Sequence, residues 1–98
     1  MRIEYRNNQI RRICTDAYEA EKRHGKAMAE RIHMRVDQIA AASSVEMMIE
    51  YRIGRCHCLK GKRREQYAVD LIHPYRLVFE KKGNEVQIAR IMEIVDYH

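Results

Sequence analysis

Several residue types are scarce or missing in this chain. Its 98 residues include no tryptophan, one phenylalanine, one proline and four glycines, and no internal repeat is visible. Such a composition excludes low-complexity sequence. No stretch approaches the roughly eighteen apolar residues of a membrane-spanning helix, and no signal peptide opens the sequence. We therefore expect one globular domain over residues 1–98 with a single modest core, and no role at a membrane.

Cysteine is also sparse. Three cysteines, an odd number, without an export signal indicate reduced thiols and a cytoplasmic protein. Cys56-His57-Cys58 invites a zinc interpretation, but strand alternation turns His57 away from the two sulfur atoms. Only Cys14 is left as a third thiol, so a four-ligand site is hard to complete. We expect no metal and no cofactor.

Charge is balanced everywhere except in one segment. The formal net charge is +5, and residues 52–66 hold six basic side chains against one acidic side chain, Glu65. The remaining thirteen basic and thirteen acidic residues cancel, so this segment carries the whole excess. A neutral body with one basic segment is typical of a protein that binds a polyanion. A solvated surface turn has the same composition, and the position of other motifs must decide between the two. The basic residues are Arg52, Arg55, Lys60, Lys62, Arg63 and Arg64.

The first half of the sequence has helical periodicity. Apolar and polar residues alternate over residues 1–5, which predicts a short strand. Apolar side chains then recur at helical spacing over about residues 10–23. Gly25 ends that helix, and a second helix is predicted over residues 26–42, ended by Ser43 and Ser44. The apolar stripes of both helices are typical core faces. We expect the two helices to form an antiparallel hairpin.

The second half of the sequence has the residue pattern of β-strands. Strands are predicted over residues 55–59, 66–72, 75–81 and 85–95, divided by residues 60–64, 73–74 and 82–84. Connections this short favour antiparallel pairing. The predicted fold class is therefore α+β, with an N-terminal helical hairpin packed on one face of an antiparallel β-sheet. The other face of such a sheet stays open.

Alternation predicts which side chains reach the open face. Tyr75, Leu77 and Phe79 share one side of their strand and are expected against the helices, which turns Arg76 to the uncovered side. His57 points away from its two flanking cysteines. If those cysteines belong to the core, His57 shares the open face with Arg76.

Some of these residues suit metal-free cleavage of RNA. That reaction needs a base for the 2′-hydroxyl proton, an acid for the 5′-oxygen, and cations for the charge of the phosphorane. Imidazole titrates near neutral pH, so histidine suits the acid and base roles. The candidates are His57 and His98 as base and acid, Asp96 as an orienting group, Lys60 and Arg76 as cations, and Tyr97 as a stacking or hydroxyl group.

Each candidate also has a plainer interpretation. A histidine on a strand is usually a surface residue, and Arg76 has the chemistry of an ordinary ion-pair partner. The residues 96–98 stand at the end of the sequence, where chains usually fray. Residue type alone does not decide between these interpretations.

The order of motifs in the second half resembles a known family. The sequence reads Cys-His-Cys-Leu-Lys-Gly at 56–61, Tyr-Ala-Val at 67–69, Tyr-Arg-Leu-Val-Phe at 75–79 and Asp-Tyr-His at 96–98. This order resembles the HigB toxins, the plasmid maintenance killer branch of the RelE/ParE superfamily. The resemblance covers about residues 51–98 in sequence, and the first half only in the order of its helices. The terminal Asp-Tyr-His is its most specific element.

The resemblance implies a fold and an activity. It implies a RelE-like, microbial ribonuclease-like fold and a toxin of a type II toxin–antitoxin system that cleaves mRNA in the ribosomal A site without a metal. It also implies a HigA-like helix-turn-helix antitoxin, through which alone operator DNA is contacted. The positions that match the family's catalytic residues are His57, Lys60, Arg76, Asp96, Tyr97 and His98, with Arg55, Lys62, Arg63 and Arg64 available for RNA and ribosome binding.

The sequence departs mildly from the family pattern. Cys58 stands where proline is common, Tyr75 replaces the more frequent tryptophan, and the basic run at 62–64 replaces the usual Gly-Asp-Arg.

Two other interpretations of the function stay open. A ParE-like toxin shares the fold but poisons DNA gyrase through protein contacts, and a non-catalytic module would bind RNA or the ribosome with the basic segment and sheet face alone.

Overall fold

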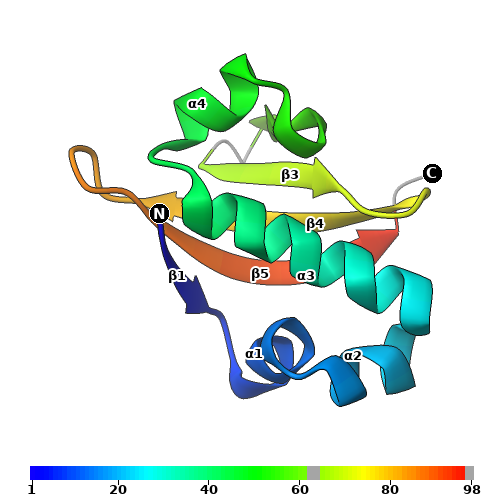
Figure 1. The fold of residues 1–98 in the computed structure, drawn as a ribbon. Coiled ribbons are helices and arrows are strands. Elements are labelled where there is room, and N and C mark those ends of the chain that lie inside the picture. The colour runs from blue at the N-terminus through cyan, green and yellow to red at the C-terminus, as the bar shows by residue number, and fades with distance from the viewer. Residues whose placement is uncertain (62–64, 97–98) are drawn as a thin grey trace.

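The computed structural model describes residues 1–61 and 65–96, and residues 62–64 and 97–98 are outside the description. Within the described residues, helices lie against one face of a five-stranded sheet whose strand order is β1-β5-β4-β3-β2 (Figure 1). The α+β fold class predicted from the sequence is confirmed. The elements are β1 (Arg2–Tyr5), α1 (Asn8–Thr15), α2 (Ala17–His24), α3 (Lys26–Ala41), α4 (Val45–Glu50), the 3₁₀ helix η1 (Ile53–Arg55), β2 (His57–Cys58), β3 (Gln66–Asp70), β4 (Tyr75–Lys82) and β5 (Ile88–Asp96).

The single helix predicted over residues 10–23 is wrong in one respect, because Asp16 divides it into α1 and α2. Asp16 has an extended backbone, and its carboxylate accepts hydrogen bonds from the N–H groups of Tyr18 and Glu19. An aspartate in that position starts a new helix. Gly25, with φ of 84°, then separates α2 from α3, as expected. The α1–α2 pair runs opposite to α3 in Figure 1, as the helical hairpin requires.

The sheet is mixed, whereas the sequence predicted antiparallel pairing throughout. β2, β3, β4 and β5 are antiparallel neighbours, but β1 pairs with β5 in parallel, with Ile3 opposite Ala89. A parallel pair needs a long crossover connection. In the described residues, the connection from β1 to β5 contains all four α-helices and the other three strands, so the parallel pair joins the first strand to the last.

The segment between α3 and β2 carries structure that the periodicity did not predict. Ser44 caps the short helix α4 by accepting a hydrogen bond from the N–H of Met47 at 3.1 Å. The buried Gln87 accepts a hydrogen bond from the N–H of Val45 at 2.9 Å and donates one to the carboxylate of Glu46 at 2.7 Å. These bonds fix α4 to the start of β5. No helix in the described part of the chain is both long and apolar enough to cross a membrane.

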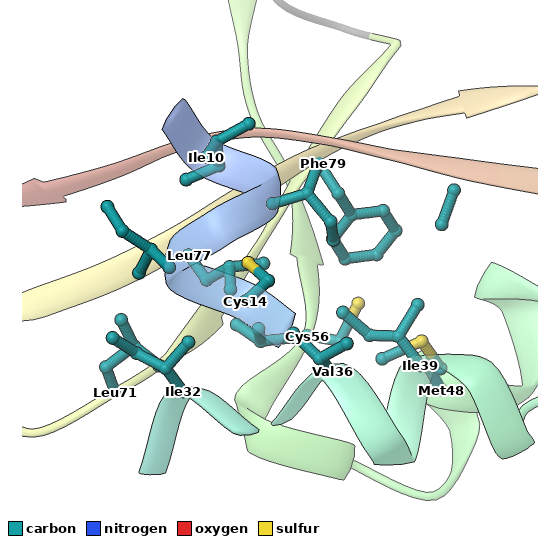
Figure 2. Packing of buried hydrophobic residues seen from close by; sticks show 14 of the residues in the cluster. Ile10, Cys14, Ile32, Val36, Ile39, Met48, Cys56, Leu71, Leu77 and Phe79 are labelled. Atoms are coloured by element: carbon teal, nitrogen blue, oxygen red, sulfur yellow. The ribbon is translucent and has the colours of Figure 1, made fainter. Parts of the chain in front are cut away.

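The core lies between the helices and one face of the sheet (Figure 2). Leu77 and Phe79 are fully buried there, as alternation predicted, and they face Ile32 and Ile39 of α3. Tyr75 was expected to join them but is 37% exposed. It is the first residue of β4, so it lies near the end of the sheet, where the hydrophobic core stops. Cys56 is buried in the core, whereas Cys58 is exposed.

Candidate functional site

His57 and Arg76 lie on the same, uncovered face of the sheet. His57 of β2 is the register partner of Ala68, and Arg76 of β4 is the partner of Asp70. Ala68 and Asp70 are two residues apart on β3, so their side chains share a face, and their cross-strand partners share it with them. Strand spacings place the Cα atoms of His57 and Arg76 about 12 Å apart. This separation leaves room for a substrate group between them.

A cluster of two arginines and one carboxylate stands beside His57. Asp70 Oδ1 lies 3.3 Å from Arg76 Nε, and Asp70 Oδ2 lies 3.5 Å from Arg55 Nε. The same residues line a polar pocket of about 290 Å³, together with residues 71 and 73–75. We call Arg55, Asp70 and Arg76 the arginine cluster. It concentrates two positive groups at one end of the open face.

Asp70 was missed by the sequence reasoning. It lies within the strand predicted over residues 66–72 and belongs to none of the motifs; in the structure it is the last residue of β3. The signal that could have found it is the hairpin register, because a turn centred on residue 73 places Asp70 opposite Arg76. Opposite charges on directly paired strand residues attract one another.

The sequence predicts a strand that begins at Arg55, but the structure places Arg55 in the turn before β2. This turn brings Arg55 to the arginine cluster. Arg52, Gly54 and Arg55 have φ values of 53°, 57° and 54°, in the left-handed region. The chain therefore turns tightly just before β2. The turn directs the largely exposed Arg55 side chain toward Asp70 and leaves His57 as the first residue of the strand.

The His57 ring is held by the same turn. Its Nδ1 atom lies 3.0 Å from the carbonyl oxygen of Arg55. A carbonyl oxygen only accepts hydrogen bonds, so Nδ1 must carry the proton that is donated. In the neutral imidazole the lone pair is then on Nε2. Nε2 of His57 is thus the ring nitrogen that can accept a proton.

The floor between the charged groups is apolar. Ala68 is paired with His57 on one side and with Val78 on the other, so both apolar side chains point to the same face as His57. Both are nevertheless fully buried. Glu93 of β5 ends this row opposite Val78. Because the exposure of Ala68 and Val78 is zero, neighbouring side chains cover both residues, and a ligand on this face would contact those neighbours.

Of the remaining predicted site residues, the structure describes Lys60 and Asp96. Lys60 is exposed and follows β2. Asp96 ends β5 opposite Tyr75, one residue out of phase with Arg76, so the pleat directs its Cβ to the other side. Lys62, Arg63, Arg64, Tyr97 and His98 lie outside the described residues.

The three thiols differ in ways that test the strand phase. Burial raises the pKa of Cys14 to about 12, and burial, followed by the nearby Cys58, raises the pKa of Cys56 to about 12. At pH 8 only about one in ten thousand such thiols is ionised, and the thiolate is the reactive form. We expect iodoacetamide to modify one thiol per folded chain rapidly at pH 8, and Cys58→Ser to abolish this fast phase. Mass spectrometry of the alkylated protein checks this, and rapid labelling of Cys56 would contradict the assigned strand phase.

Comparison with known proteins gives a structural neighbour. No protein-family model matches the chain, and no curated protein sequence matches it either. Among solved structures, the chain is similar to a YoeB/ParE toxin from Agrobacterium tumefaciens, with a TM-score of 0.59 and 15% sequence identity over 100% of both chains. At this identity the similarity establishes that the two proteins share a fold.

Proposed function

We propose that this chain is the toxin of a type II toxin–antitoxin pair and an endoribonuclease of the HigB type that cleaves mRNA in the ribosomal A site. The observation that carries the proposal is the arginine cluster beside His57 on the uncovered face of the sheet. Two guanidinium groups held by one carboxylate suit a phosphodiester, because arginine binds phosphate through paired N–H donors. The fold that it shares with a YoeB/ParE toxin supports the same assignment.

The site supports a division of roles in an acid–base mechanism. His57 Nε2 removes the proton of the substrate's 2′-hydroxyl, because Nδ1 is occupied at the carbonyl of Arg55. Arg55 and Arg76 balance the charge of the phosphorane, and Lys60 adds to the positive field. In this proposal His98 protonates the 5′-oxygen, Asp96 orients it, and Tyr97 stacks on a base. The roles of these three follow from the chemistry of their side chains, and their place in the site follows from the family resemblance.

The basic segment is assigned to ribosome binding and not to the cleavage step. Replacing Lys62, Arg63 and Arg64 together with serine is expected to weaken ribosome binding, because each lost phosphate contact reduces the release of counterions. The loss should total about 10-fold or more at moderate salt, and the salt dependence of binding should become shallower by about two to three in slope. Sedimentation with ribosomes at several salt concentrations checks this. A variant that binds normally but cleaves slowly would assign the segment to the chemistry instead.

The partners proposed for this chain follow from the same function. They are a HigA-like helix-turn-helix antitoxin, the ribosome and mRNA, in the cytoplasm, with operator DNA contacted only through the antitoxin. A ParE-like gyrase toxin would need none of His57, Asp96, Tyr97 and His98. A binding module would need the cations but no acid or base.

Brief expression followed by primer extension on cellular mRNA separates these three functions. Discrete cuts within translated codons, absent with His57→Ala, support the proposed endoribonuclease. Intact message with induction of the DNA damage response would overturn it in favour of a gyrase toxin. Arrested translation with intact message would overturn it in favour of a binding module.

A further inference from the structure

One side chain reaches the arginine cluster from the covered side of the sheet. Arg35 lies on α3, and its Nε donates a hydrogen bond to the carbonyl oxygen of Asp70 at 2.7 Å. Its Nη1 donates to the side-chain oxygen of Gln38, one helical turn further along, at 2.9 Å. Arg35 is thus anchored to its own helix and holds the last residue of β3. That residue is the one whose carboxylate binds both Arg55 and Arg76.

The same guanidinium also packs against the turn that carries Arg55. A Cβ atom added to Gly54 would lie 2.9 Å from Arg35 Nε and 3.1 Å from its Cζ. Such short distances mean that the Arg35 side chain lies close against the backbone of Gly54. Arg35 therefore contacts the two segments that carry the arginine cluster, namely the end of β3 and the turn before β2.

We infer that Arg35 is a positioning residue, which fixes the separation of Arg55 and Arg76 by holding Asp70 through its main chain and Gly54 through packing. The inference rests on the proposed function, in which these two arginines bind the reacting phosphate. Arg35 itself lies behind the site and touches no reacting atom. Its effect passes entirely through Asp70 and Gly54.

The surroundings of Arg35 favour such a role. Burial lowers its pKa, the neighbouring Arg31 lowers it further, and Asp70 raises it. A partly desolvated guanidinium still stays charged, because the pKa of free arginine is above 12. Hydrogen bonds from a charged donor in a poorly hydrated place are short and strong, and they hold their acceptor firmly. A lysine in place of Arg35 provides one charged donor but lacks the planar fork that reaches Gln38 and Asp70 together.

The test uses Arg35→Met, Arg35→Lys and the control Arg31→Met, which removes a neighbouring arginine on the same helix. In a ribosome-programmed cleavage assay, Arg35→Met should lower kcat by about 10- to 100-fold with KM changed less than about 3-fold, since misplacement by about 1 Å has effects of that size. Arg35→Lys should recover part of the loss, and Arg31→Met should stay near wild type. An equal kcat for Arg35→Met and Arg31→Met would overturn the inference.

A double-variant cycle separates positioning from general destabilisation. If Arg35 acts through Asp70, the pair Arg35→Met and Asp70→Asn should be little worse than Asp70→Asn alone. Independent losses that multiply would show that Arg35 does not act through Asp70. Thermal unfolding of each variant shows that every rate is measured on folded protein.

A second readout does not depend on activity. The Nε–H signals of Arg55 and Arg76 in an NMR spectrum of ¹⁵N-labelled protein report whether each group stays on Asp70. In Arg35→Met both signals should shift and broaden, while in Arg31→Met they should stay in place. Unchanged signals would overturn the positioning role even if wild type cleaves message. Shifted signals in a protein that does not cleave would retain the positioning role and reject the proposed function.

Discussion

Replacing Arg76 with alanine is expected to slow cleavage of ribosome-bound message by about 10²- to 10³-fold, the usual effect of losing one group that stabilises developing charge. The proposed mechanism has Arg76 at the reacting phosphate, and the core face of β4 is occupied by Leu77 and Phe79. The loss should therefore be seen in the single-turnover rate constant for cleavage and not in ribosome binding. Arg55 stays on Asp70 in this variant, which keeps part of the positive field.

The fold should tolerate the same substitution. Arg76 and Asp70 are about one-third and one-quarter exposed, and ion pairs of that kind contribute about 1 kcal/mol or less to stability. No cavity is left in the core. Lys82→Ala, at the other end of β4, is the matched control and should cleave at nearly the wild-type rate. Unfolding of Arg76→Ala would show that its side chain supports the sheet, and an undiminished rate would remove Arg76 from the mechanism.

Alternation and helical spacing predicted the parts of the fold that depend on local sequence. Leu77 and Phe79 lie in the core, and a helix ends at Gly25. Both features were predicted because alternation with a period of two, and a glycine that favours a positive φ, can be recognised within one short segment. The break at Asp16 was missed because the apolar spacing continues through it, and only the capping role of its carboxylate ends α1. The parallel pairing of β1 depends on contacts between the two ends of the chain, which no local pattern records.

The same difference between local patterns and long-range contacts explains which residues of the candidate site were predicted. The shared sheet face of His57 and Arg76 was predictable, since each lies within an alternating motif. Asp70 and Arg35 were not, because their importance comes from the register of β3 with β4 and from the packing of α3 beneath that strand. Arg55 was placed on a strand, and its true direction depends on three left-handed residues, of which only Gly54 is of a type that favours that conformation.

A message with 2′-deoxyribose at the cut position is expected to resist cleavage completely while still occupying the A site. In the proposed mechanism the attacking oxygen is the substrate's own 2′-hydroxyl. Its proton passes to Nε2 of His57 as the oxygen bonds to phosphorus, and the bond from phosphorus to the 5′-oxygen then breaks as that oxygen takes a proton from His98. The products are a 2′,3′-cyclic phosphate upstream and a 5′-hydroxyl downstream. Without the 2′-hydroxyl no nucleophile is present, so the effect is a loss of reaction and not a slower rate.

End-group analysis of the purified downstream fragment is the decisive measurement. A 5′-hydroxyl is labelled directly by polynucleotide kinase, whereas a 5′-phosphate must first be removed. A 2′-methoxy sugar at the same position is a second test, because it keeps the ribose oxygen but carries a methyl group in place of the proton that the mechanism assigns to His57 Nε2. Cleavage of either modified message, or a 5′-phosphate on the fragment, would mean that an activated water attacks the phosphorus. In that case His57 would act on water, and the arginine cluster would hold the same phosphate for a different nucleophile.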